Sequence, residues 1–446
     1  MNHRRTAAAE VAFTVVALLA GTLGPVYQLR ILLAPMADSY AEDQLVALMF
    51  CVVYVIAAIA GARATGRVHP LPLFTTVGLT AVLAASTLWS PAPALSATQA
   101  VLAAMTLVLP WYLARRWTVD QVVTMAWVAT SVGVALSAAA VAVGRANAVD
   151  AAGDWAGIYY NRNSLGPVAG LCLVLGLREA SRSTASSWTT WLGTVDEPRD
   201  HQTADGHRDA RADVIRRAIA VATVLLSGAL LYGSGSKSSI LSTVGVLAAW
   251  AGVELLTRYV GSLRTRLGAV SGFLAAMAAV LVLLFRPLAR ALGSDDTLQG
   301  RTELWSYLAR RLRERPLTGD GWLAVYTTDD YWYWGVEHLS RNVATAHNGL
   351  VEVAVGGGVV AFAALLGVLW FGLSNAVREV CGSRQAVGGL VVAMYFMLAN
   401  SGETFIGAHH LPWVLFLGCC VFRWTPSPGD GAVDSDVPSR PGWSRR

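Results

Sequence analysis

Four short polar clusters interrupt the apolar runs of this chain, and their side chains are of the kinds that handle phosphate esters. They cover residues 160–163, 234–239, 300–305 with His347-Asn348, and 401–404. Arginine and lysine beside hydroxyl and amide donors suit a diphosphate, both as a bound group and as a leaving group. Histidine suits the general base that an attacking sugar hydroxyl needs. If the four clusters meet in space, they predict glycosyl transfer from a lipid diphosphate to a hydroxyl.

Four residues carry most of this chemistry. We expect His347 to activate the acceptor, and Arg301, Lys237 and Arg162 to bind the diphosphate. Lys237 is the only lysine of the chain and is placed in a Ser/Gly turn. Plainer interpretations stay open, because an interfacial histidine can simply be solvated or cap a helix, and arginine near a membrane can snorkel to the headgroups. Supporting roles are expected for Asn348, Asn163, Ser236, Trp305 and Glu403.

An aromatic run and two pairs of aspartates each have a functional and a purely structural interpretation. The aromatic run 331–334 could stack on sugars, but tryptophan and tyrosine are common at membrane interfaces. Asp295-Asp296 and Asp329-Asp330 could bind a divalent metal ion, although adjacent aspartates in a polar loop are usually only solvated. None of the five cysteines has metal-ligand spacing. Metal binding is therefore the weaker interpretation, and no cofactor is indicated.

The elements that must position these clusters are membrane-spanning helices. The chain is 54% hydrophobic and only 14% charged, whereas a soluble domain averages about 25% charged residues. Its apolar runs are continuous, and many reach the roughly 20 residues that a helix needs to cross a bilayer. We predict an all-α integral membrane protein with about twelve transmembrane helices. They are placed at 10–33, 44–61, 71–89, 97–113, 119–143, 164–178, 215–232, 239–257, 268–285, 349–372, 386–400 and 411–423.

Basic residues orient the predicted spans. With the N-terminus inside, arginines fall in the inner connections, for example Arg63 with Arg67 and Arg115 with Arg116, as the positive-inside rule requires. Both termini are then cytoplasmic, and the four polar clusters lie on the outer face of the cytoplasmic membrane. Because the arginines sit mainly in short loops, membrane orientation explains the net charge of +5 without a nucleic-acid partner.

Three polar segments are expected outside the bilayer, within or after a membrane domain at 1–424. Residues 179–213 are predicted to form a cytoplasmic loop, and 425–446 a disordered cytoplasmic tail. Residues 286–348 are the longest outer segment, a large extracytoplasmic loop between the ninth and tenth spans. Within it, 301–315 has the spacing of an amphipathic helix. This outer segment is where we expect the catalytic residues.

Taken in order, the motifs resemble those of the O-antigen ligase and polymerase superfamily of bacterial membrane glycosyltransferases. The resemblance covers roughly residues 150–420. It is carried by Asn161-Arg162-Asn163, Ser236-Lys237-Ser238, Gly300-Arg301 with Trp305, Arg315-Pro316-Leu317 with Gly319 and Gly321, and His347-Asn348-Gly349 with Gly356–Gly358.

The resemblance implies a GT-C-like membrane fold and an inverting, metal-independent transfer of a glycan from undecaprenyl diphosphate. The superfamily's acceptor-activating histidine falls on His347, and its diphosphate-handling arginine falls on Arg301. Lys237 stands where the superfamily usually has arginine; lysine keeps the charge and loses the planar fork. Glu403 loosely matches an acidic position near the penultimate span.

Several activities stay open at this point. A ligase joins a glycan to a glycan or glycolipid acceptor, whereas a polymerase joins repeat units, and both share these motifs. A transporter of lipid-linked glycans is an alternative of another class, but it predicts charges within spans and two similar halves, neither of which is evident. A metal-dependent GT-C enzyme would use the aspartate pairs. The motifs do not specify the acceptor, the sugars or the linkage.

Overall fold

The computed structural model describes residues 2–33, 44–150, 152–182, 205–291, 300–339, 343–383 and 386–423. In this part of the chain every regular element is a helix, and the β contacts are two isolated bridges. The all-α prediction is therefore confirmed. The helices are α1 (Asn2–Ala20), α2 (Gly24–Leu33), α3 (Gln44–Arg63), α4 (Pro70–Ala85), η1 (Ser86–Leu88), α5 (Pro93–Thr106), α6 (Val108–Arg116), α7 (Val119–Ala142), α8 (Arg162–Ser181), α10 (Asp205–Gly233), α11 (Lys237–Tyr259), α12 (Leu263–Ala291), α13 (Arg301–Glu314), η2 (Ala324–Thr327), α14 (Asp329–Leu339), α15 (Gly349–Gly382), α16 (Val387–Gly402), α17 (Leu411–Phe416) and the π-helical turn η4 (Leu417–Val421).

Eight helical stretches of the described chain are long and apolar enough to cross a membrane. They are α3, α4, the pair α5 and α6, α7, α10, α11, α12 and α15. A ninth span results if α1 and α2, which are bent by 78°, are counted together, and α16 and the pair α17 and η4 are apolar but shorter. The chain is therefore a multi-pass membrane protein, and the number of twelve spans stays a prediction.

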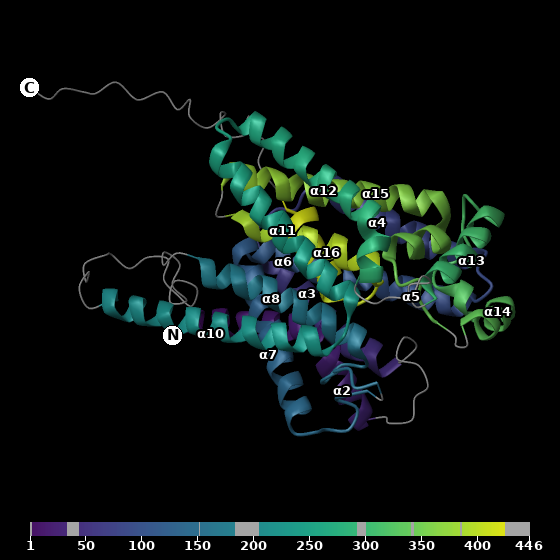
Figure 1. Cartoon of the computed structure of the whole chain (residues 1–446), viewed down its shortest axis with the longest axis horizontal. Coiled ribbons are helices and arrows are strands. Elements are labelled where there is room, and N and C mark those ends of the chain that lie inside the picture. Colours follow the sequence, from purple (N-terminus) through teal and green to yellow (C-terminus); the bar gives the residue numbers. More distant parts are fainter. Residues whose placement is uncertain are drawn as a thin grey trace, which may run out of the picture.

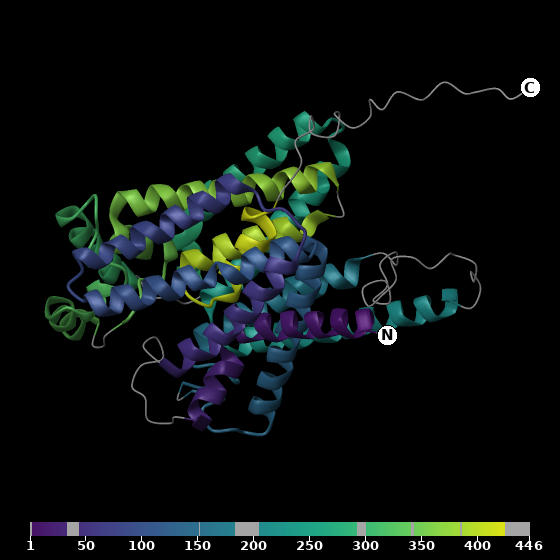
Figure 2. The ribbon, with the colours of Figure 1, turned by 180° about the vertical axis from the view of Figure 1, so that it is seen from behind.

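Several long helices, among them α10 and α15, run along the long axis of the molecule, and α13 and α14 lie at one end (Figure 1). The view from behind shows α1 starting near the opposite end (Figure 2). We call the first end the α13 end. The other is the arginine end, where Arg116, Arg178 and Arg216 form ion pairs with carboxylates. Polar chemistry is thus gathered at both ends of an apolar bundle.

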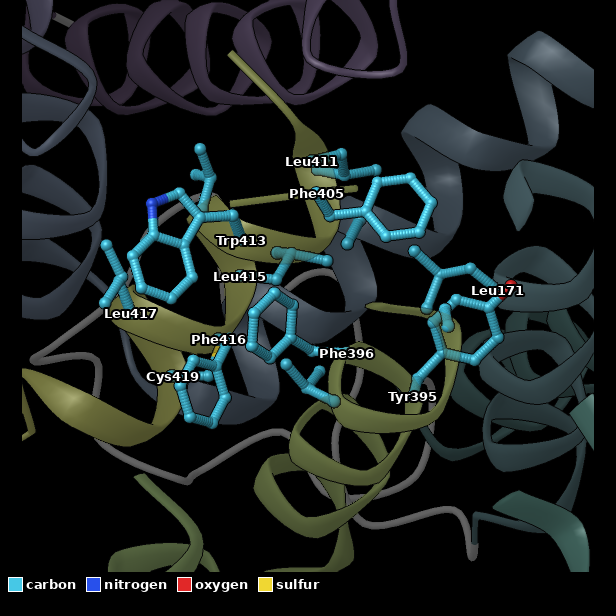
Figure 3. Close-up of a cluster of buried hydrophobic side chains, with 14 of the residues drawn as sticks. Leu171, Tyr395, Phe396, Phe405, Leu411, Trp413, Leu415, Phe416, Leu417 and Cys419 are labelled. Atoms are coloured by element: carbon cyan, nitrogen blue, oxygen red, sulfur yellow. The ribbon is translucent and has the colours of Figure 1, made fainter. Parts of the chain in front are cut away.

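The short helix α16 lies in the middle of the hydrophobic core. Most of its residues are buried, as expected of a helix that is apolar on all sides. Phe396 stacks on Phe416 with ring centroids 4.6 Å apart and is tilted against Trp413 (Figure 3). Tyr395 donates a hydrogen bond to the carbonyl oxygen of Pro167 in α8. Packing on all sides fixes α16, and with it the residues that follow its last turn.

A break in α15 receives the turn that follows α13. Gly358 has a φ of 67° and a ψ of −167° within the helix, and the next amide, Val359 N–H, donates to Pro316 O at 2.8 Å. A Cβ added to Gly358 would lie 2.2 Å from Leu317 O, so only glycine permits this approach. The glycine-rich pieces of the superfamily pattern therefore meet in space and join α13 to α15.

The polar segment predicted at 286–348 is largely helical where it is described. It contains the end of α12, then α13, η2 and α14; residues 292–299 and 340–342 are outside the described chain. The predicted tail, 425–446, also lies outside it, and so does the middle of the predicted cytoplasmic loop, 183–204. The rest of that loop forms the end of α8 and the start of α10.

Candidate active site

Glu403 joins the two residues that we expected to do the chemistry. It directly follows α16, and its Oε2 lies 2.8 Å from His347 Nδ1. Its Oε1 accepts a hydrogen bond from Arg301 Nη2 at 2.9 Å, while Arg301 Nη1 donates to Gly402 O at 2.6 Å. The side chains of Arg301, Glu403 and His347 are 15%, 12% and 25% exposed. The group is therefore sheltered and still accessible from outside the protein.

This geometry determines which nitrogen of His347 can act as a base. A carboxylate only accepts hydrogen bonds, so we assign the imidazole proton to Nδ1, pointing at Glu403. Nε2 then keeps its lone pair and can accept a proton. Two of the five N–H groups of Arg301 donate hydrogen bonds, to Glu403 and to Gly402 O. A base and a cation with further donors thus share one carboxylate.

The backbone of His347 adopts a conformation that few residues other than glycine adopt. Its φ is 49°, in the left-handed region. On one side, Trp305 Nε1 donates to Ala346 O at 2.8 Å. On the other, Asn348 caps α15 by accepting from two N–H groups of its first turn, and donates to Ser401 O at 3.2 Å. A strained residue fixed from both sides is typical of functional sites, and Trp305 and Asn348 are what fix it.

Glu352 supports the site and was not among the residues expected from the sequence. It lies in the first turn of α15 and is 2% exposed. Its Oε2 accepts from Ala346 N–H at 2.7 Å and from Thr404 Oγ1 at 3.3 Å. It thereby ties together the two segments that carry His347 and Glu403. Glu352 lies within the predicted span 349–372, so the expectation that the spans contain no charges is wrong at this residue. A carboxylate inside an apolar span is a candidate functional residue by default.

The first residues of α8 reach the same place. Asn163 lines a small cavity together with Arg301 and His347. The cavity has a volume of about 30 Å³, which is large enough to hold water. Arg162 begins α8 and forms an ion pair with Asp154. Asp154 is thus a second carboxylate that sequence reasoning missed, and it balances the charge of Arg162.

The turn before α11 lies between α8 and the end of α16. A Cβ added to Gly166 of α8 would lie 2.6 Å from Ser236 Cβ, and one added to Gly402 would lie 2.7 Å from Ser238 Cβ. Lys237 begins α11 between these two contacts. The structure therefore brings the four polar clusters together, and it gives Ser236 a packing contact with α8.

Helix α13 buries its apolar face inside the protein. Leu304 and Tyr307 are buried, and Tyr307 stacks on Trp334 of α14 with centroids 4.5 Å apart. Tyr307 also donates a hydrogen bond to Asp330 at 2.7 Å. Burial and this bond raise the pKa of Tyr307 above its ordinary value, so its phenol remains a donor. These contacts hold the helix that begins with Arg301.

The aromatic run and the aspartate pairs are less involved in the site. Tyr331 is buried, whereas Trp332 and Tyr333 are 51% and 69% exposed, so those two can meet sugars or headgroups. Among the described residues, no three His, Cys, Asp or Glu side chains are grouped as metal ligands. The pair Asp295-Asp296 lies outside the described chain.

Comparison with known proteins points to one family. A family model described as "O-Antigen ligase" matches residues 222–366. The matched segment extends from α10 into α15 and includes Lys237, Arg301 and His347. No curated protein matches the chain. The resemblance to the O-antigen ligase superfamily is confirmed over this segment, and it supports a membrane enzyme of the O-antigen ligase or polymerase type.

Proposed function

From the O-antigen ligase segment and the group of His347, Glu403 and Arg301, we propose that this membrane enzyme transfers a glycan from a lipid diphosphate to a hydroxyl. The observation that carries the proposal is one carboxylate shared by a histidine and an arginine. Such a group offers a base for the nucleophile and positive charge for the leaving group at the same place. The resemblance supports undecaprenyl diphosphate as the carrier and an inverting, metal-independent reaction.

In the proposed reaction, the acceptor oxygen attacks the anomeric carbon of the donor sugar while the bond from that carbon to the diphosphate oxygen breaks. His347 Nε2 takes the hydroxyl proton, and Glu403 stabilises the imidazolium that forms. Arg301 and Lys237 stabilise the negative charge that develops on the lipid diphosphate. General-base assistance of this kind contributes about 10²–10⁴-fold to the rate. Attack from the side opposite the leaving group inverts the anomeric centre.

We place the reaction on the outer face of the cytoplasmic membrane. Arg116, Arg178 and Arg216 lie at the arginine end of the bundle, and basic residues favour the cytoplasmic side. The group around Glu403 is at the other end, with α13. This orientation also makes the start of α1 cytoplasmic. It gives the site access to donors and acceptors that are exposed outside the cytoplasm.

A deletion strain tests the proposal and separates its two variants. Accumulation of full-length lipid-linked chains indicates a ligase, and accumulation of single repeat units indicates a polymerase. We expect wild-type protein to restore transfer and His347→Ala to leave it lost, with normal expression and membrane insertion. His338→Ala is a matched control, because His338 lies on α14 with its side chain 43% exposed. Normal glycan attachment by the His347→Ala protein would remove His347 from the mechanism.

A further inference from the structure

A large apolar groove begins at the rim of the candidate site and extends toward the arginine end. Its volume is about 960 Å³, close to the upper limit for pockets that enclose a drug-sized ligand. Its walls are α12, α15 and α16. Trp305, Asn348 and Ser401 line one end, and Arg378 lines it near the end of α15. The groove therefore extends along much of the length of the helices.

The groove and the catalytic group share their boundary residues. Trp305 donates to the carbonyl oxygen of Ala346, which precedes His347. Asn348, which follows His347, donates to Ser401 O, and Ser401 also lines the groove. A hydrocarbon chain that leaves the groove at this rim emerges beside His347. A diphosphate attached to that chain would meet the site's cations.

We propose that this groove seats the hydrocarbon chain of the donor lipid and selects donors with a long isoprenoid chain. The inference rests on the proposed function. Since lipid tails are as apolar as the groove, the chain gains little hydrophobic free energy by entering it, and the groove acts by holding the diphosphate in position. Met277, Met394 and Met397 line it, and their flexible side chains suit an irregular, methyl-branched chain.

Helix α12 provides the side through which the chain enters. Only 11% of its membrane window is buried, compared with 28–50% for the other candidate spans of the described chain. Ser271, Ala275 and Ala278 of α12 line the groove and are nevertheless exposed. The groove thus communicates with the surface of the bundle along α12. A chain can slide in from the bilayer without being threaded from the outer face.

A phospholipid is the competing occupant. Its phosphate would lie on Arg378, and its acyl chains would fill the groove from the arginine end. Such a lipid would have no connection to the catalytic group. The shared boundary at Trp305 and Asn348 favours the donor chain, since it joins the groove to the segment that carries His347.

Photolabelling of the purified full-length protein in lipid nanodiscs tests the proposal. The probes are undecaprenyl diphosphate and farnesyl diphosphate, each with a diazirine at the end of the chain remote from the diphosphate. We expect the long probe to label the inner half of the groove, around Trp370 and Ser374, and the short probe to label only the rim near Met397. Mass spectrometry of the labelled peptides locates both.

Variants of the groove wall make this test specific. Ser374→Trp should abolish labelling of the inner half by the long probe and leave rim labelling by the short probe unchanged, which also shows that the variant is folded. Ser271→Trp, on the facing wall, should have the same effect. Val360→Trp is the matched control, because Val360 lies on α15 outside the groove and is 51% exposed.

The outcomes separate this inference from the proposed function. If no probe labels the protein, or if Arg301→Gln leaves rim labelling unchanged, the proposed diphosphate site is wrong. If both probes label the rim in an Arg301-dependent manner but the long probe never reaches the inner half, only the groove inference is overturned. The same holds if labelling of the inner half depends on Arg378 and not on Arg301, as a phospholipid would require.

Discussion

Two groups of arginine and glutamate lie at opposite ends of the bundle, and they differ in how far their side chains are exposed. At the arginine end, the side chains of Arg178 and Glu179 are each 2% exposed, and Arg216 of α10 donates to the carbonyl oxygen of Glu179 at 2.6 Å. At the α13 end, Arg301 and Glu403 are 15% and 12% exposed, and their carboxylate also contacts a histidine. The first group joins helices, whereas the second presents a histidine and an arginine to the outside.

The comparison shows that pairing of arginine with a carboxylate does not by itself identify an active site. At the arginine end, further carboxylates complete the network, since Asp120 pairs with Arg178 and Arg182, and Asp213 pairs with Arg216. At the α13 end, one carboxylate serves both an arginine and a histidine. Exposure and a titratable partner distinguish the second group, and matched substitutions at both ends can test this distinction.

The largest contrast is expected from glutamate-to-glutamine substitutions at the two ends. Glu179→Gln removes the carboxylate that Arg178 and Arg216 share and leaves them only Asp120 and Asp213. Because breaking a buried pair costs about 3–5 kcal/mol, we expect a clear loss in the free energy of unfolding. Glu403→Gln removes a partly exposed charge, so we expect little change in stability and a clear loss of transfer. Thermal unfolding of the purified proteins in detergent, together with a transfer assay, measures both effects.

The two substitutions must differ in kind for the comparison to hold. Glu179→Gln should lower Tm, and the fraction that remains folded should keep its specific activity. Glu403→Gln should keep the wild-type Tm, because only the assigned imidazole tautomer and the position of Arg301 depend on the lost charge. A Glu403→Gln protein that is destabilised as much as Glu179→Gln would mean that Glu403 is a structural residue like Glu179.

Arg301→Lys comes next in expected effect. Arg301 contacts Gly402 O and Glu403 at the same time, and an ammonium group on a flexible stem cannot reproduce this planar geometry. Hydrogen bonds of charged groups contribute about 1.5–3 kcal/mol, so we expect the transfer rate to fall roughly 10- to 100-fold. Arg313→Lys, an exposed position on the same helix, is the control and should leave the rate unchanged. Equal rates for both variants would contradict a role for the guanidinium fork.

A smaller effect is expected where α16 meets the turn before α11. The Cβ of Gly402→Ala would lie 2.7 Å from Ser238 Cβ, and overpacking of this kind typically costs about 1–3 kcal/mol. We expect Gly402→Ala to displace Glu403 and slow transfer several-fold. The double variant with Ser238→Gly should recover activity, because it removes the opposing atom. Gly382→Ala, whose Cβ would meet nothing within 4 Å, is the control, and a double-mutant cycle measures the coupling.

The all-helical membrane fold, and the residues that the structure groups at the candidate site, could be predicted from the sequence for simple physical reasons. Apolar length alone decides that a segment enters the bilayer, so composition was sufficient for an all-helical membrane protein. His347 and Glu403 are polar residues just outside apolar runs, where such residues are conspicuous, and Arg301 begins the amphipathic stretch within the long polar segment. The prediction that they meet on one face rested on the orientation of the spans, which the basic loops indicated.

Other features depend on contacts that a linear pattern does not contain. The run 10–33 is continuously apolar and predicts one span, yet the chain turns at Leu23, with a φ of 69°, and bends by 78°. Gly24-Pro25 was the available signal, because proline does not continue a helix. Glu352 is the second example. Its role is visible only when Ala346 and Thr404 are seen on either side of it.

The smallest effect is expected from removing divalent metal ions. At the α13 end, we propose that Arg301 and Lys237 supply the positive charge for the leaving group, and the described residues there include no group of three metal-ligating side chains. We therefore expect EDTA to leave the transfer rate of the purified enzyme in proteoliposomes unchanged, with the preformed Mg²⁺–EDTA complex as the control. We expect Asp329→Asn to leave the transfer rate unchanged as well. If EDTA abolished activity and added Mg²⁺ restored it, a metal ion and not Arg301 would neutralise the diphosphate. The difference between the α13 end and the arginine end would then include a bound cation.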